Sequence, residues 1–120
     1  MDHIKRILAD FPFVVLDGGF ATELEKMGFN LKNRLWSAKI LSESTEAVKA
    51  VHLSYLEAGA DCIITSSYQA TIPGFMSSGF TKSESEDLIR LSLKLAQEAV
   101  EIFMDRESNS DRPEPFIAAS

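Results

Sequence analysis

The chain carries near its start the stretch FVVLDGG, at residues 13–19, and this stretch decides the fold. Its first four residues are continuously apolar, and such a run is typical of a strand that is buried on both faces in a parallel sheet. Asp17, Gly18 and Gly19 then end the run with a carboxylate and two conformationally free residues. We therefore predict a buried strand over 13–16 followed by a polar turn.

Two further apolar runs follow, CIIT at 62–65 and FIAA at 116–119, and segments with a helical pattern separate the three runs. Alternation of this kind is typical of parallel strands joined by helical crossovers, so the sequence predicts an α/β fold. The intervening segments are predicted as a short helix over 21–27, irregular or short helical structure over 30–41, a helix from Ser44 or Thr45 to Gly59, a loop containing Pro73, Gly74 and Gly79, and a long helix from a capping box of Thr81 and Glu84 to about Arg106.

The predicted strands are too few to close a barrel of parallel strands. A closed barrel of parallel strands needs eight strands and typically about 250 residues, whereas three strands are predicted here. The last of them, over 116–119, has no helix after it to cover it. We therefore expect residues 1–120 to be the N-terminal part of a larger domain.

The composition argues against several classes of partner. The 120 residues have a net charge of −6 and a pI near 4.8, whereas a protein that binds the phosphate backbone of nucleic acids needs a basic patch. No apolar run approaches the ~20 residues of a membrane span, and the first residues lack the pattern of a secretory signal. We expect a cytoplasmic protein that binds neither nucleic acid nor membranes.

Two polar segments are candidates for a ligand site, because ligands of parallel α/β folds bind at the carboxyl ends of the strands. Asp17, Gly18 and Gly19 follow the first strand, and the second strand opens into a cluster of hydroxyl and amide groups. The carboxylate of Asp17 could pair with an ammonium group or a metal; equally, Asp17 could cap the following helix while the two glycines make the turn. The cluster after the second strand consists of Thr65, Ser66, Ser67, Tyr68 and Gln69.

Three other residues have a functional and a structural interpretation. Trp36, the only tryptophan, could form a wall of a pocket or simply cover the barrel. His52 lies four residues after Val48, beside the apolar face of its helix, and is predicted to be a hydrogen-bonded packing histidine. Cys62, the only cysteine, begins a buried strand and is predicted to be a small core residue rather than a nucleophile. A single cysteine also excludes a disulfide framework within this chain.

Four longer stretches resemble a known family. They are LDGGFATEL at 16–24, LWSA at 35–38, HLSYLEAGAD at 52–61 and ITSSYQATIPGF at 64–75. With these stretches, residues 13–120 resemble the N-terminal part of homocysteine S-methyltransferases, and most closely the plant and bacterial enzymes that use S-methylmethionine or S-adenosylmethionine.

The resemblance implies a (β/α)8 TIM barrel, of which this chain would hold the first three strands, and methyl transfer to homocysteine to give methionine. It implies that Asp17 binds the homocysteine amino group, that Gly18 and Gly19 let the substrate lie against the backbone, and that Trp36 and residues 65–69 line the pocket. It also implies zinc held by cysteines in the C-terminal half of the family, which this chain does not contain. The alternative is a truncated, non-catalytic fragment or an interaction module that lacks the zinc-binding half.

Overall fold

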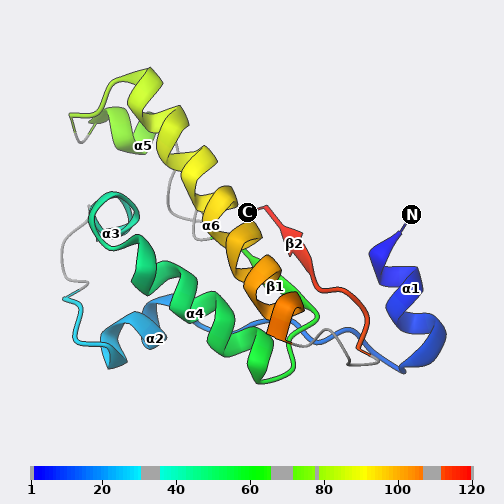
Figure 1. The fold of residues 1–120 in the computed structure, drawn as a ribbon. Coiled ribbons are helices and arrows are strands. Elements are labelled where there is room, and N and C mark those ends of the chain that lie inside the picture. Colours follow the sequence, from blue (N-terminus) through cyan, green and yellow to red (C-terminus); the bar gives the residue numbers. More distant parts are fainter. Residues whose placement is uncertain (1, 31–35, 66–71, 78, 107–111, 120) are drawn as a thin grey trace.

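A computed structural model describes residues 2–30, 36–65, 72–77, 79–106 and 112–119. Within these ranges the chain forms helices and two short strands, arranged as an α/β structure (Figure 1). The elements in chain order are α1 (His3–Asp10), α2 (Phe20–Lys26), α3 (Trp36–Glu43), α4 (Thr45–Glu57), β1 (Cys62–Ile64), α5 (Ile72–Ser77), α6 (Lys82–Arg106) and β2 (Phe116–Ala118).

The two strands are parallel, as the sequence predicts. Cys62 pairs with Phe116 and Ile64 with Ala118, so β1 and β2 lie in register over their whole length. A single parallel bridge joins Leu16 to Cys62 on the other edge of β1. The three predicted strand segments therefore lie side by side, with β1 in the middle.

The prediction of a buried strand over 13–16 is wrong in this structure. Only Leu16 makes a bridge, and the side chains of Phe13 and Leu16 are 64% and 60% exposed. The physical reason is that a continuous apolar run becomes a doubly buried strand only where other elements cover both of its faces. Within the described ranges, these side chains have no such cover.

Helices α4 and α6 pack against each other, and α4 also contacts β1 while α6 contacts β2 (Figure 1). One buried cluster joins Leu56 of α4, Ile63 of β1 and Phe103 of α6. A second cluster joins α4 and α6 to α2, α3 and α5 through side chains such as Leu24, Val51 and Leu88. Phe20 and Ala21, which follow Gly19 at the start of α2, pack against the second cluster.

The strongest helix signals of the sequence are confirmed. The capping box begins α6, because the Thr81 amide donates to Glu84 Oε1 at 2.9 Å and the Glu84 amide donates to Thr81 Oγ1 at 3.1 Å. The hydrogen bond from the Thr81 amide, followed by a contribution from the Thr81 side chain, lowers the pKa of the Glu84 carboxyl. Gly28 and Gly59 adopt positive φ values of 95° and 115° just after α2 and α4, as helix-ending glycines do.

Two helices differ from the prediction. α1 is not predicted by the sequence analysis; it begins because Asp2 Oδ1 accepts a hydrogen bond from the Ile4 amide at 3.0 Å, and it buries only Ile7. α5 occupies part of the predicted loop around Pro73 and Gly74. Proline is tolerated in the first turn of a helix, and Phe75 anchors this turn in the core, so the apolar contact outweighs the local preference for a loop.

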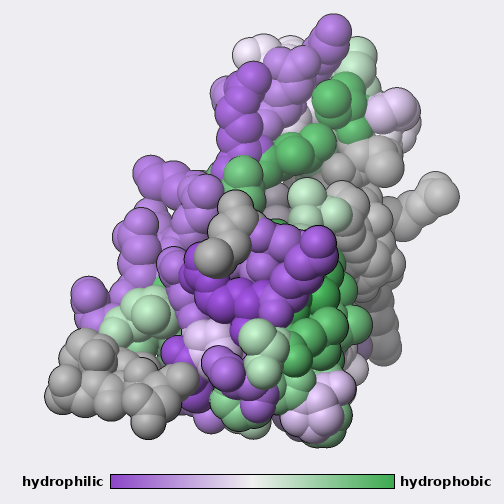
Figure 2. Space-filling view, turned by 90° about the vertical axis from the view of Figure 1, so that its right-hand side faces the viewer, coloured by the Kyte–Doolittle hydropathy of each residue, from purple (hydrophilic) through white to green (hydrophobic). Residues whose placement is uncertain are grey.

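Several large apolar side chains are exposed to solvent. The space-filling view shows hydrophobic surface next to strongly hydrophilic surface on the same face (Figure 2). The exposed side chains include Phe11, Phe13, Val15 and Leu16. The radius of gyration is 15.2 Å, against about 13.6 Å expected for a domain of this length. Within the described ranges, no helix combines the length and the apolar character needed to cross a membrane.

We predict that the 120-residue chain alone associates with itself, because Phe13 and Leu16 are exposed and the strand edges have no further partner among the described residues. Sedimentation velocity over a range of protein concentrations should show a weight-average mass that rises with concentration. Replacing both Phe13 and Leu16 by serine should reduce this rise, whereas Met27→Ser, at an exposed apolar residue after α2, should not. A stable monomer with one sharp unfolding transition at every concentration would contradict the prediction.

His52 is fully buried in α4 and contacts Phe20, whose ring centroid lies 5.4 Å from that of the imidazole. The predicted packing role is therefore confirmed, but the predicted hydrogen bond is not found: neither ring nitrogen has a partner among the described residues. Burial lowers the pKa of His52 to about 4, because the charged imidazolium would lose its hydration. The core thus holds His52 in its neutral form.

We predict that His52 weakens the fold as the pH falls from about 6.5 to about 4. In this window the unfolded chain binds a proton at His52 while the folded chain does not, so protons favour unfolding. A pKa lowered from 6.5 to about 4 corresponds to a loss of about 3 kcal/mol. The unfolding midpoint of dilute protein should fall less steeply over this window in His52→Leu. Parallel pH profiles for the two proteins would contradict the prediction.

Candidate functional site

A cavity of about 510 Å³ lies where the segment after Leu16 meets the carboxyl end of β1. It brings together the two polar segments that the sequence places at strand ends, with Asp17 from the first and Thr65 from the second. The beginning of α2 closes one side of it. The lining residues are Asp17, Gly18, Gly19, Phe20, Ala21, Thr22, Ile64 and Thr65.

Asp17 is held by two hydrogen bonds to β1. Its amide donates to the carbonyl of Cys62 at 3.0 Å, and its Oδ2 accepts from the amide of Ile64, also at 3.0 Å. Burial raises the pKa of the Asp17 carboxyl above its ordinary value, against the opposing effect of the amide donors. A half-buried carboxylate in this setting gains more from a cationic ligand than one in open water.

The alternative in which Asp17 caps the following helix is wrong. The N-cap of α2 is Gly19, and no side chain makes a capping hydrogen bond there. The carboxylate reaches sideways to β1 instead. Asp17 therefore has a structural role, but that role is to tie its segment to the central strand.

Gly18 and Gly19 both adopt negative φ, so neither is required by a left-handed turn. Gly18 is required by a neighbour: a Cβ atom at this position would lie 2.9 Å from Tyr55 Oη and 3.0 Å from Tyr55 Cε1. The Tyr55 hydroxyl also donates to the carbonyl of Gly19 at 2.8 Å. The glycines thus bring this backbone into contact with α4.

The other predicted site residues are placed only in part. Thr65 is buried beside the cavity, and its amide donates to the carbonyl of Ala118 at 3.0 Å. Trp36 is the first residue of α3, but its side chain lies outside the described structure. Four predicted residues also lie outside the described ranges: Ser66, Ser67, Tyr68 and Gln69.

The described residues contain no group of three or more histidine, cysteine, aspartate or glutamate side chains that could hold a metal ion. Cys62 is buried, and burial raises the pKa of its thiol, which opposes the thiolate form that zinc binds. Its predicted place in the core is confirmed. The donor set of this part of the chain therefore does not fit a zinc site.

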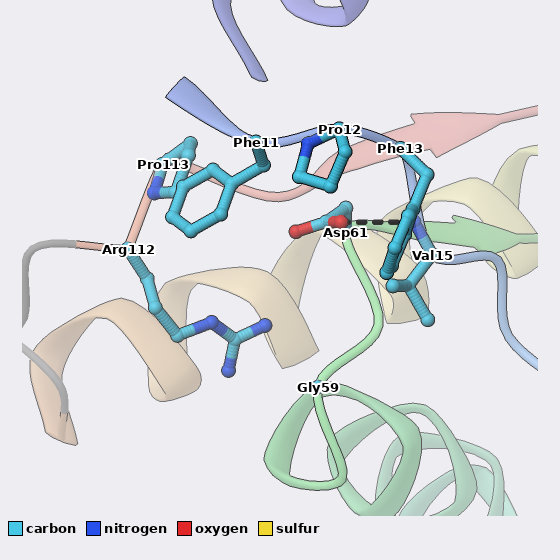
Figure 3. A pocket seen from close by; sticks show the side chains of 8 residues that line it. All are labelled: Phe11, Pro12, Phe13, Val15, Gly59, Asp61, Arg112 and Pro113. Atoms are coloured by element: carbon cyan, nitrogen blue, oxygen red, sulfur yellow. Dashed lines mark hydrogen bonds between the residues drawn. The ribbon is translucent and has the colours of Figure 1, made fainter. Parts of the chain in front are cut away.

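A second cavity, of about 280 Å³, lies near the amino end of β1. Figure 3 shows the rings of Phe11, Pro12 and Phe13 around the carboxylate of Asp61, which accepts a hydrogen bond from the amide of Val15 at 2.9 Å. Arg112, on its far side, donates to the carbonyls of Leu56 and Ala60 at 3.0 Å each. These polar groups hold the end of α4 and the first segment in place.

Sequence reasoning missed Tyr55, Thr22 and Ile64 as neighbours of the site. The helical spacing of Tyr55 from Val48 and Val51 predicts a place on the apolar face of the helix, which is consistent with its packing but gives no partner for the hydroxyl. The pairing of Ile64 with Asp17 depends on the register of two segments 47 residues apart. The available signal was the motif at 52–61, which contains Tyr55 and lies between the two polar segments.

Comparisons with known proteins relate this chain to one family. The family model for homocysteine S-methyltransferase matches residues 14–120. Homocysteine S-methyltransferase YbgG of Bacillus subtilis is 51% identical over 121 residues, which cover 100% of this chain and 38% of that protein. Homocysteine S-methyltransferase 4 of Zea mays is 53% identical over 109 residues, which cover 88% of this chain and 32% of that protein.

Solved structures give the same relationship. The oxidized form of the homocysteine methyltransferase MmuM from Escherichia coli superposes with a TM-score of 0.90 at 41% identity, over 98% of this chain and 40% of that one. Its metallated form gives a TM-score of 0.88. This chain thus spans about two fifths or less of the length of the relatives it matches. It belongs to the homocysteine S-methyltransferase family.

Proposed function

We propose that this chain supplies the amino-acid-binding side of an enzyme that transfers a methyl group from S-methylmethionine or S-adenosylmethionine to homocysteine. The observation that carries the proposal is the half-buried carboxylate of Asp17 beside a cavity of about 510 Å³ at the carboxyl end of β1. Membership of the methyltransferase family supports the choice of reaction. The cytoplasm and methionine biosynthesis are its expected setting.

Asp17 would bind the ammonium group of homocysteine. Oδ2 is used in the contact with Ile64, so the ammonium would approach through Oδ1. A hydrogen bond between charged groups is typically worth about 1.5–3 kcal/mol, and partial burial strengthens it. Gly18 and Gly19 have no side chains that would keep the substrate away from the backbone. Thr65 would form part of the opposite wall.

Methyl transfer itself is a displacement at carbon. The homocysteine sulfur, after losing its proton, attacks the methyl carbon of the sulfonium donor, and the donor sulfur leaves with the bonding electron pair as a neutral thioether. The described residues bind and orient one reactant, and they do not fit the zinc site that would favour the thiolate. We therefore propose the activity for a protein of the family's full length, with these residues in an eight-stranded barrel.

The second candidate is a non-catalytic role for the 120 residues by themselves. It is favoured by the exposed apolar surface and by the absence of a three-ligand metal cluster from the described ranges. The two candidates differ in a simple assay. The isolated chain should bind homocysteine weakly and produce no methionine, whereas the full-length protein that contains it should produce methionine with one of the two donors.

We predict that Asp17→Asn in the full-length enzyme weakens homocysteine binding ten- to a hundred-fold, from the loss of one charge-assisted contact. Asparagine can still accept the hydrogen bond of Ile64 through its side-chain oxygen, so the melting temperature should change little. Asp17→Ala removes this hydrogen bond as well, so it should lower both the affinity for homocysteine and the melting temperature. Isothermal titration with homocysteine and thermal unfolding measure the two effects.

Asp61→Asn is the matched control. The Asp61 carboxylate accepts the same kind of hydrogen bond from a backbone amide, that of Val15, but at the other end of the paired segment. Its substitution should leave homocysteine binding unchanged. If Asp17→Asn and Asp61→Asn both bind homocysteine as the wild type does, Asp17 acts only in the structure and the proposed amino-group site is wrong.

A further inference from the structure

We propose that Tyr55 is a positioning residue for the amino-group site, whose hydroxyl and ring fix the backbone at Gly18 and Gly19 and so fix the Asp17 carboxylate. The inference rests on the proposed function, because it assigns to Tyr55 a part in binding homocysteine. Tyr55 reaches the segment from α4, outside the lining of the cavity. It therefore acts through Asp17 and not by touching the substrate.

The first contact is a hydrogen bond. Tyr55 Oη donates to the carbonyl oxygen of Gly19 at 2.8 Å, across 36 residues of sequence. Gly19 is the N-cap of α2, so this bond also fixes where α2 begins. Burial, with the negative charge of Glu23 as the next cause, raises the pKa of Tyr55, and the hydroxyl remains a donor throughout the physiological pH range.

The second contact is steric. The Tyr55 ring lies so close to Gly18 that a methyl group there would meet Oη at 2.9 Å and Cζ at 3.2 Å. The ring therefore prevents the Gly18 peptide from moving toward α4. Two neighbouring residues of one turn are thus fixed by one side chain, which is itself part of a helix anchored by the buried Val51 and Leu56.

Asp17 lies between this contact and a second support. On one side, β1 holds its amide and its Oδ2 through Cys62 and Ile64. On the other side, Tyr55 holds the next two residues. A binding group needs to be held within about 0.5 Å of its productive position. Without the Tyr55 side, Asp17 is held from β1 alone, so its carboxylate can shift with the freed turn while the hydrogen bonds to β1 keep the segment folded. The loss should therefore affect binding before it affects folding.

The test uses Tyr55→Phe in the full-length enzyme, which removes the hydroxyl and keeps the ring against Gly18. Loss of the neutral hydrogen bond from Tyr55 to the Gly19 carbonyl should raise the KM for homocysteine about three- to ten-fold. The KM for the methyl donor should stay unchanged. The matched control is Ser54→Ala, which removes a hydroxyl-to-carbonyl hydrogen bond from the same helix, that of Ser54 to Val51. It should leave both KM values unchanged.

A second variant tests the steric contact. Gly18→Ala should raise the KM for homocysteine, because the added methyl group must displace either the Tyr55 ring or the turn. Added to Tyr55→Leu, which removes the ring, the same Gly18→Ala change should cost less than it does in the wild type. This non-additivity is expected only if the two residues act on each other. Equal effects of Gly18→Ala in both backgrounds would overturn the steric part of the proposal.

Asp17→Asn, measured in the same assay, distinguishes a failure of the positioning role of Tyr55 from a failure of the proposed amino-group site. If Asp17→Asn weakens homocysteine binding and Tyr55→Phe does not, the positioning role is wrong and the proposed function stands. If neither variant affects binding, the amino-group site itself is wrong. A merely structural Tyr55 would lower the melting temperature and the active fraction of Tyr55→Phe, with both KM values equal to those of the wild type.

Discussion

The structure depends on how residues 15–17 are tied to β1. Backbone hydrogen bonds run from Asp61 and Cys62 to the carbonyl of Val15, and from Asp17 to the carbonyl of Cys62. Two carboxylates complete the pairing, because Asp61 accepts from the amide of Val15 and Asp17 from the amide of Ile64. Each aspartate lies at one end of this pairing, in which the described residues form one β-bridge, between Leu16 and Cys62. Hydrogen bonds to side chains here hold two segments together, whereas in most sheets a longer series of backbone hydrogen bonds does so.

The carboxylate of Asp17 therefore has two roles, one in the structure and one in the proposed binding site. One carboxylate oxygen is used to hold the segment, and the proposed substrate contact needs the same group to remain charged and accessible. Burial raises the pKa of the carboxyl, while the Ile64 amide stabilises its charged form. Tyr55 makes the two roles compatible, because it holds the following turn through the Gly19 carbonyl and does not use the carboxylate. The same segment can therefore be rigid and still present a negative charge to the cavity.

Sequence reasoning predicted those parts of the fold whose stability is local or strongly periodic. α6 begins with a capping box, α4 is followed by a glycine with positive φ, and both helices have apolar faces. β1 is a short apolar run between helices, and β2 is a short apolar run that follows α6. It failed for α1, which has one buried side chain, and for α5, where Phe75 outweighs the proline and glycine. For the site, it brought Asp17 and Thr65 to one place, since strand ends meet at one edge. It could not find Tyr55 Oη on Gly19, because helical spacing gives the face of a side chain but not the atom it contacts.

The exposed run at 13–16 connects these results with the length of the relatives. Its continuous apolar pattern specifies burial on both faces, yet the described residues pair it on one edge and leave Phe13 and Leu16 in solvent. The chain spans 38% of the Bacillus relative, so that protein has further residues that can supply such contacts. Among the described residues, the hydrogen bonds of Asp17 and of the Gly19 carbonyl are made to Tyr55, Cys62 and Ile64. The proposed amino-group site is therefore formed by contacts within the described residues, whereas the same residues leave the apolar run at 13–16 without cover on its faces.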